Sequence, residues 1–290
     1  MIVSFGHIRM DIQIDIPSSL TPGSQHHSTQ NIIEIGGSSA LQTIAAARCG
    51  AKATIRGTTG NDLFAEKIFT TLRREGIQHN ALIREDSSTS IATTITSPSS
   101  SPTMFIPSQH ALDNLEDLIP DTSLHARTLL LLNHEIHEST LDSFLTRTKN
   151  SEAKSILCVE YKNDVDPALL KKADLVIFGY QNDDKDKIES CITFDATAPH
   201  SCFISKTNTS VEVPALPQSS DGIIHPSGAF DVFCGFMASC IQAGLSMTTS
   251  AEYGLHAAQI TASRPGTYRA IPYLDEVKKQ IEKSGALETA

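Results

Sequence analysis

The middle of the chain alternates short apolar runs with helical stretches, and this alternation limits the possible folds more than any other feature. Apolar runs span residues 129–132, 156–160 and 175–178, with helical periodicity over 141–147 and 167–172 between them. Strands joined by helices in this way are typical of βαβ units, whose parallel sheet is buried on both faces. Ligands of such sheets bind at the carboxyl ends of the strands. The sequence therefore predicts an α/β protein with its site at that edge.

Four other stretches predict a separate small sheet. Residues 11–16, 31–35, 90–96 and 103–106 are rich in Thr and Ile and are separated by polar or Pro/Ser turns. The alternative, an ordinary extra sheet on the edge of the core, stays open, because a pattern alone does not assign a strand to a layer.

A helix that starts near Gly228 is the first candidate for chemistry. Apolar residues recur with helical spacing up to Gly244, at Val232, Phe233, Phe236, Met237, Cys240 and Ile241. The first amides of a helix lack internal partners and the helix dipole is positive there, so the N–H groups of Ala229, Phe230 and Asp231 could hold an anion.

Asp231 would lie beside that anion. Its carboxylate could take a proton from a hydroxyl that attacks a phosphorus atom, while the amides neutralise the developing charge. The alternative is structural: Ser227 caps the helix, and Asp231 is a first-turn carboxylate that favours the dipole.

A second motif lies near the N-terminus. Gly36 and Gly37 open a helix of small residues that ends at Gly50, and a short strand, a turn and a second amphipathic helix ending at Gly76 follow. This stretch resembles the first signature of the ribokinase-like (PfkB) carbohydrate kinases. The segment 227–233 resembles the second, where the family reads Asp-Thr-Thr-Gly-Ala-Gly-Asp. The resemblance extends to Asp11 and to the tail around 256–272.

The resemblance implies a single ribokinase-like domain over residues 1–290. Its core would have three α/β/α layers with a mainly parallel central sheet. The small sheet, with strands within 11–35 and 81–106, would be a lid over the sugar site and the interface of a homodimer.

The resemblance also implies a function, transfer of the terminal phosphoryl group of ATP to a hydroxyl of a small sugar or sugar derivative, with Mg²⁺ bridging the phosphates. Asp231 would be the base. The residues that match other family positions would be the anion hole Gly228, Ala229 and Phe230, the substrate residues Asp11, Arg9, Gly36 and Gly37, and the nucleotide residues Asn182, Thr193 and His256.

Simpler interpretations of three of these residues remain open. Asp11 could be a turn carboxylate, Arg9 could face solvent, and His256 could be a capped or exposed helix residue.

Several departures from the family pattern keep alternatives open. Phe230 replaces the second Gly of the second signature, and a bulky residue there conflicts with a backbone that needs a positive φ or touches a phosphate. Leu41 and Arg9 replace sugar-binding Asn residues of ribokinases, so we expect a substrate other than ribose. Arg9 could instead pair with a carboxylate or phosphate on an acidic or phosphorylated sugar. The usual Asn-x-x-Glu nucleotide motif lacks its Glu after Asn182. The alternatives are a non-catalytic ribokinase-like protein that binds a sugar or nucleotide, and a nucleoside kinase.

Composition excludes other classes of function. A net charge of -10 argues against nucleic acid as a partner, and no apolar run approaches the roughly 20 residues of a membrane span, so we expect a cytoplasmic protein. The six Cys include no Cys-x-x-Cys pair, so we expect neither a disulfide scaffold nor a metal site. A dinucleotide-dependent enzyme would need a Gly-x-Gly-x-x-Gly after the first strand, which the chain lacks.

Overall fold

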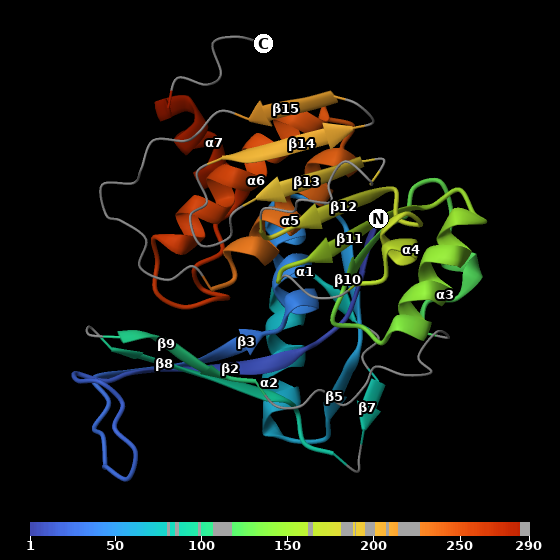
Figure 1. Cartoon of the computed structure of the whole chain (residues 1–290). Helices are drawn as coiled ribbons and strands as arrows, with labels where there is room; N and C mark the ends of the chain where they lie inside the picture. The colour runs from blue at the N-terminus through green and yellow to red at the C-terminus, as the bar shows by residue number, and fades with distance from the viewer. Residues whose placement is uncertain are drawn as a thin grey trace.

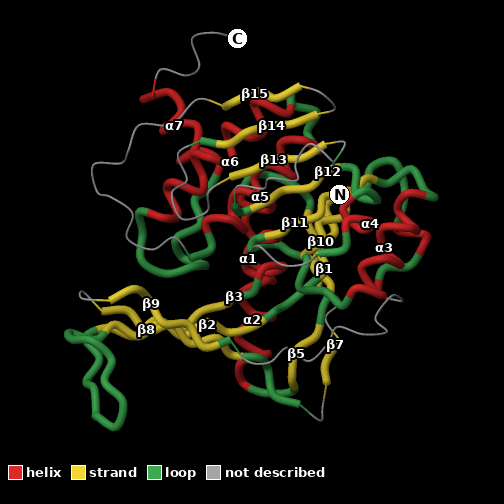
Figure 2. The backbone as a smooth tube through the Cα atoms, viewed as in Figure 1, coloured by secondary structure: helices red, strands yellow, loops and turns green. Residues whose placement is uncertain are grey.

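The computed structural model describes residues 1–79, 82–84, 87–97, 100–106, 118–161, 165–180, 188, 190–194, 201–206, 209–213 and 227–284. Two sheets and the helices around them dominate this part of the chain (Figures 1 and 2). The helices are α1 (Ser38–Arg48), α2 (Leu63–Arg74), α3 (Glu138–Lys149), α4 (Pro167–Leu170), α5 (Ala229–Gln242), α6 (Met247–Ala262) and α7 (Leu274–Ser284), with a 3₁₀ turn, η2, at Asp121–Ser123.

The large sheet has nine strands and is mainly parallel. These are β1 (Ile2–Phe5), β4 (Ala53–Arg56), β6 (Gln78–His79), β10 (Leu129–Asn133), β11 (Lys154–Val159), β12 (Leu175–Phe178), β13 (Ser190–Phe194), β14 (Cys202–Lys206) and β15 (Thr209–Val213). Their order is β15-β14-β13-β12-β11-β10-β1-β4-β6. All neighbours from β6 to β13 are parallel, while β14 and β15 extend the sheet as antiparallel strands.

Both faces of the large sheet are covered, which confirms the predicted three-layer α/β/α core. Successive strand residues point to opposite faces, so Leu131 packs in the cluster that holds Phe233 of α5, and Leu130 in the cluster that holds Phe144 of α3. Helices α5 and α6 therefore cover one face, and α3 and α4 cover the other. This burial explains why the central strands read as continuous apolar runs.

The predicted small sheet is present, and it projects from one end of the core (Figure 1). It consists of β2 (Arg9–Asp15), β3 (Gln30–Gly36), β8 (Ile91–Ser97) and β9 (Ser100–Phe105), in the order β3-β2-β8-β9. Because β2 follows β1 after only three residues, the chain passes directly from the large sheet into the small one. A further pair of short parallel strands, β5 (Thr58–Gly60) and β7 (Leu82–Arg84), lies apart from both sheets.

Helices α1 and α5 pack unusually close to each other, and Gly235 makes this possible. A Cβ atom at position 235 would lie 2.6 Å from the Cβ of Ala45 and closer still to the carbonyl oxygen of Gln42. Real Cβ atoms do not approach that closely, so any larger residue would push the helices apart. This contact matters for the site, because α1 and α5 each contribute one of its side chains.

Other expectations concern the cysteines, metals and the membrane. All six Cys are free and buried. The described ranges contain no group of three or more His, Cys, Asp or Glu side chains placed to hold a metal ion. Nor does any helix in them have the length and apolar character needed to cross a membrane.

We predict that Gly235→Ala destabilises the protein. In an exposed helix this change would be stabilising by about 1 kcal/mol, because Ala has the higher helix propensity. Here the added methyl group overpacks the contact with α1, and we expect the free energy of unfolding to fall by about 1–3 kcal/mol. Urea denaturation measures the effect, with Ser284→Ala at the exposed end of α7 as the control, expected within ~0.5 kcal/mol of the wild type. An unchanged or higher stability of Gly235→Ala would contradict the proposed packing role.

Candidate functional site

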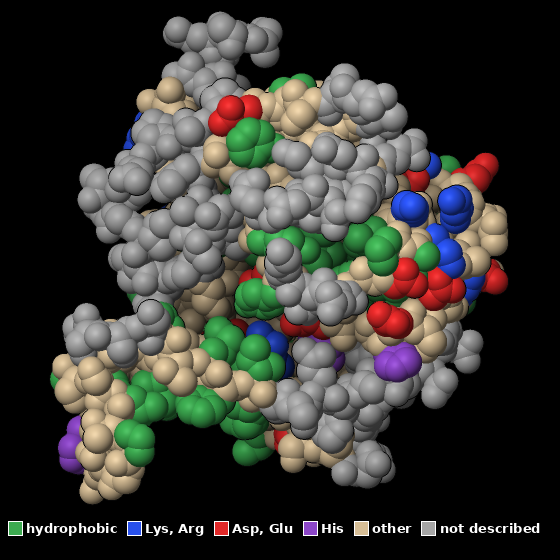
Figure 3. Space-filling model, viewed as in Figure 1, with side chains coloured by type: hydrophobic (Ala, Val, Ile, Leu, Met, Phe, Trp, Pro, Cys, Tyr) green, Lys and Arg blue, Asp and Glu red, His purple; other side chains and the backbone are tan. Residues whose placement is uncertain are grey.

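The candidate site lies where the carboxyl ends of the central strands meet the first turn of α5. Asn133 ends β10, Glu160 follows β11 directly, and Asp231 lies in the first turn of α5. This is the edge at which ligands bind in parallel sheets. Figure 3 shows the molecule hollowed between the small sheet and the core, with acidic and basic side chains in the hollow.

Helix α5 begins as the sequence predicts, at Gly228, which is its N-cap with φ +82°. Only glycine adopts this left-handed conformation readily, so the residue turns the chain sharply into the helix. The alternative in which Ser227 caps the helix is wrong, because the cap is Gly228 and no side chain accepts a hydrogen bond there. The amides of the first turn consequently have no side-chain cap, and Asp231 lies among them.

Phe230 does not obstruct these amides. As the second residue of α5 it has a helical backbone, and its side chain, 2% exposed, lies in the core cluster on that face of the sheet. A Cβ at Gly179 would come within 3.0 Å of the Phe230 ring. The ring thus fills space beside the end of β12, where Gly179 leaves room, and the conflict expected from the sequence does not arise.

A buried hydrogen-bond network holds Asp231. The Nε2 group of Gln42, on α1, donates to Oδ1 of Asp231 at 2.9 Å and to Oδ1 of Asn133 at 2.6 Å. Asn133 donates back to Oε1 of Gln42 at 3.3 Å. Gln42 and Asn133 are both fully or nearly fully buried, and Asp231 is 5% exposed. One oxygen of Asp231 is therefore fixed by the protein.

Burial and neighbouring carboxylates disfavour the ionised form of Asp231. Desolvation raises its pKa well above the ordinary value, the charges of Glu160 and Glu135 raise it further, and the hydrogen bond from Gln42 opposes the shift. Burial and the Glu135 carboxylate likewise raise the pKa of Glu160 to about 7. Glu135 itself accepts a hydrogen bond from the Ser38 hydroxyl at 2.9 Å. The site therefore places two carboxyl groups, Asp231 and Glu160, where their ionised forms are disfavoured.

Arg9 and Asp11 form an ion pair on the small sheet. The Nε of Arg9 lies 3.1 Å from Oδ1 of Asp11, and the two side chains are 16% and 11% exposed. Arg9 therefore does not turn out to solvent. The Thr267 hydroxyl donates to Oδ2 of Asp11 at 3.3 Å, yet burial still raises the pKa of Asp11. Asp11 is thus a buried carboxylate within β2 and not a turn carboxylate.

The glycine pair makes room for this ion pair and its strand. Gly36 faces Arg9 in the strand register, and a Cβ there would overlap the Asp11 carboxylate. Gly37 has φ +92°, and a Cβ there would lie 2.5 Å from the carbonyl oxygen of His7. The glycines therefore let the β1–β2 connection approach α1 closely.

Two of the predicted nucleotide residues, Thr193 and His256, lie on different elements, β13 and α6. Asn182 lies outside the described residues. Thr193 is 1% exposed on β13, and its hydroxyl has no partner among the described residues. His256, on α6, is also 1% exposed, neither ring nitrogen has a partner there, and burial lowers its pKa to about 4. The interpretation of His256 as an exposed helix residue is wrong.

Sequence reasoning missed Gln42, Asn133, Glu135 and Glu160. Three of them, Asn133, Glu135 and Glu160, lie at or just after the carboxyl ends of predicted strands, and that position was the signal that could have identified them. No local pattern marks Gln42, because its role depends on the packing of α1 against α5.

Comparison with known proteins agrees with this architecture. Residues 1–179 match the pfkB family of carbohydrate kinases, and the chain belongs to that family. No curated protein sequence matches the chain significantly. The fold is that of ribokinase. The Giardia lamblia ribokinase is similar with a TM-score of 0.81 and 19% identity over 97% of this chain and 98% of that one.

Two further solved structures have the same fold. The Arabidopsis thaliana ribokinase, solved with ribose and ATP, has a TM-score of 0.76 and 15% identity over 97% of this chain and 98% of that one. The Methanocaldococcus jannaschii nucleoside kinase has a TM-score of 0.79 and 14% identity over the same shares of the two chains.

We predict that Glu160→Gln removes a pH-dependent loss of stability. With a folded-state pKa of about 7 and an ordinary value of 4.5, ionised Glu160 costs folding free energy. The wild type should thus lose on the order of 2–3 kcal/mol relative to the variant as pH rises from 4.5 to 7. Chemical denaturation at a series of pH values measures this difference.

The control for this prediction is Glu282→Gln, at an exposed position on α7. Its stability should follow the wild type across the same pH range. Parallel curves for Glu160→Gln and wild type would show that Glu160 titrates normally in the folded protein.

Proposed function

We propose that this protein is a kinase that transfers the terminal phosphoryl group of ATP to a hydroxyl of a small sugar or sugar derivative, with Asp231 as general base. The observation that carries the proposal is the position of Asp231, buried in the first turn of α5 with one carboxylate oxygen held by Gln42. The fold and family are consistent with this chemistry.

The proton transfer follows from that geometry. Gln42 donates a hydrogen bond to Oδ1 of Asp231, so the second carboxylate oxygen, Oδ2, would face the acceptor hydroxyl. As the hydroxyl oxygen forms its bond to the terminal phosphorus and the bond to ADP breaks, the carboxylate takes the hydroxyl proton. A raised pKa makes Asp231 a stronger base than an exposed carboxylate.

We propose that the first-turn backbone of α5 stabilises the charge that develops on the transferred group. Gly228, Ala229 and Phe230 would form this anion hole, because unpaired amides at a helix start already point at an anion and require no rearrangement. The placement of the Phe230 ring in the core supports this role, since it leaves the backbone free.

For the acceptor we propose contacts with the small sheet. Asp11 would accept hydrogen bonds from two hydroxyls, and Gly36 and Gly37 would let the acceptor approach the backbone. Nε of Arg9 is engaged by Asp11, and its terminal nitrogens have no hydrogen-bond partner among the described residues. Arg9 could therefore hold Asp11 in its ionised form and still contact an acidic or phosphorylated acceptor.

On the nucleotide side we propose the region of Asn182, Thr193 and His256. The buried hydroxyl of Thr193 and the neutral imidazole of His256 have hydrogen-bonding capacity that no described residue uses. Mg²⁺ would accompany the nucleotide, because this ion keeps waters and substrate phosphates as its main ligands and needs few protein carboxylates. The ion would neutralise phosphate charge.

We also propose that the small sheet acts as a lid and joins two copies of the chain. Exposed apolar residues lie on its strands, notably Met104 and Phe105, which are 39% and 55% exposed. Covering them in a dimer would bury apolar surface.

We predict that Asp231→Asn abolishes acceptor-dependent ADP release. The amide has nearly the same shape but cannot take a proton, so kcat should fall by at least ~10²-fold. The measurement is ADP release with ATP and Mg²⁺ across ketoses, aldoses, sugar acids, phosphosugars and nucleosides. Asp275→Asn, which alters an exposed first-turn carboxylate of α7, is the matched control. ADP release that Asp231→Asn leaves intact would contradict the base, and no release by the wild type would favour a binding protein.

We predict that Gln42→Leu shifts the acid limb of the kcat profile to higher pH. The hydrogen bond from Gln42 lowers the pKa of Asp231, so without it more base is needed to ionise the carboxylate. Unfolding measurements should also show a loss of about 1–3 kcal/mol, because the buried side chain of Asn133 loses its partner. A loss of stability with an unmoved pH profile would reduce Gln42 to a structural role. Gln242→Leu, at the end of α5, is the control.

A further inference from the structure

A cavity lies apart from Asp231, between α2, the edge strand β3 and the loop that carries Tyr268 and Arg269. Its volume is about 650 Å³, within the range of roughly 300–1,000 Å³ that small-molecule sites occupy. Its lining includes apolar side chains such as Ile33 and Leu63, which are 42% and 80% exposed. We call this cavity the α2 groove. Nothing in the proposed phosphoryl transfer uses it.

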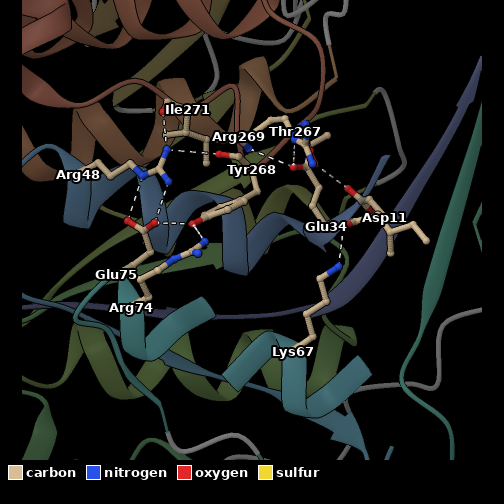
Figure 4. Close-up of polar contacts among 11 residues, drawn as sticks. Asp11, Glu34, Arg48, Lys67, Arg74, Glu75, Thr267, Tyr268, Arg269 and Ile271 are labelled. Atoms are coloured by element: carbon tan, nitrogen blue, oxygen red, sulfur yellow. Dashed lines mark hydrogen bonds and ion pairs between the residues drawn. The ribbon is translucent and has the colours of Figure 1, made fainter. Parts of the chain in front are cut away.

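Three cationic side chains converge on the α2 groove: Lys67 and Arg74 from α2, and Arg269 from the loop. Lys67 donates to the carbonyl oxygen of Ile33 at 2.8 Å, and Arg74 to the Tyr268 hydroxyl at 2.6 Å. Neither has a carboxylate partner among the described residues (Figure 4). Two positive charges thus face the groove with only neutral oxygens as hydrogen-bond partners.

The acidic groups of the groove compensate only part of this positive charge. Glu34 is 4% exposed and already bound by Nε of Arg269 at 3.0 Å and by the backbone and hydroxyl of Thr267. Glu66 is the second carboxylate of the lining. Because Glu34 and Arg269 form an ion pair, Lys67 and Arg74 remain against Glu66, and this excess of positive charge favours an anion.

We propose that the α2 groove binds a small organic oxyanion, a phosphate ester or a carboxylate. Lys67 and Arg74 would hold its charged groups, since ammonium and guanidinium groups form strong charge-assisted hydrogen bonds with such oxygens. The terminal nitrogens of Arg269, which is 54% exposed, add a third donor. Tyr268, Ile33 and Leu63 would contact the organic part.

The groove is connected to Asp11. The Thr267 hydroxyl lies 3.2 Å from Oε1 of Glu34 and 3.3 Å from Oδ2 of Asp11, so one residue bridges the two carboxylates (Figure 4). An anion that draws Arg269 away from Glu34 changes the partners of Glu34, and thereby of Thr267 and Asp11. The bound anion is thus an effector of acceptor binding. This last step rests on the proposed kinase function, whereas binding itself does not.

Methyl NMR tests the binding directly. In protein labelled at Ile and Leu methyl groups, glycerol 3-phosphate and succinate are titrated separately, with glycerol as the neutral probe. We expect saturable shifts of the Ile33, Ile35 and Leu63 methyls with at least one anion, and the arm that responds identifies phosphate or carboxylate. The same shifts should occur in Asp231→Asn, so a failed kinase assay would not affect this test.

The variant Lys67→Gln/Arg74→Gln should raise the dissociation constant by on the order of tenfold or more, since each charge-assisted contact contributes about that factor. Arg269→Gln tests the same site from another element if the double variant does not fold. Lys149→Gln/Lys279→Gln, on α3 and α7, is the matched control. Absence of saturable shifts in the wild type, or equal affinity in the folded variants, would overturn the proposal.

The effector step has its own readout in any acceptor-dependent activity. The anion should change the acceptor KM of the wild type at least twofold and leave that of Lys67→Gln/Arg74→Gln unchanged. If the anion changed the acceptor KM of the two proteins equally, its effect would not come from the groove. That result would overturn the coupling through Thr267.

Discussion

The close approach of α1 and α5 is the contact on which the candidate site depends. Gly235 lets the two helix backbones pack without an intervening side chain, and this brings Gln42 of α1 within 2.9 Å of Asp231. Gln42 also joins Asn133 at the end of β10, so one amide group links both helices to the large sheet. The position of the proposed base is therefore set by core packing and not by a flexible loop. Side chains on rigid elements are held more precisely than side chains on loops.

The burial that fixes the side chains of the site also raises the free energy of its ionised carboxylates. Desolvation and mutual repulsion raise the pKa of both Asp231 and Glu160, so the folded protein keeps acidic groups in a region that disfavours their charge. Carboxylates with raised pKa values are common at functional sites, because a carboxylate with a raised pKa is a stronger base. Structural needs alone would be met as well by neutral side chains. The retention of acidic groups at this edge is thus more easily understood as chemistry than as stability.

Much of the fold could be predicted because its signals are local. Continuous apolar runs predicted the buried parallel strands, and the Thr- and Ile-rich stretches predicted the small sheet. The start of α5 at Gly228 was predicted correctly. The alternative of a Ser227 cap arose because Ser is a common cap residue, but the structure places the cap at Gly228, whose φ a sequence does not reveal. The site was harder to predict. Gln42 contacts Asp231, which is 189 positions away in the sequence, and Thr267 contacts Asp11, which is 256 positions away. A periodic pattern of residues does not predict contacts between positions so far apart.

Thr267 shows how distant parts of the chain depend on one another. Its hydroxyl and amide bind Glu34 and Asp11 on adjacent strands of the small sheet, so the loop after α6 holds the sheet from the core side. Beside it, Tyr268 lies over Arg48, which forms a buried ion pair with Glu75. The loop therefore joins the small sheet, α1 and the end of α2 through polar contacts. Polar contacts can exchange partners at lower cost than a packed apolar interface can rearrange. A charged ligand that competes for Glu34 or Asp11 would therefore weaken the polar contacts between this loop and the small sheet.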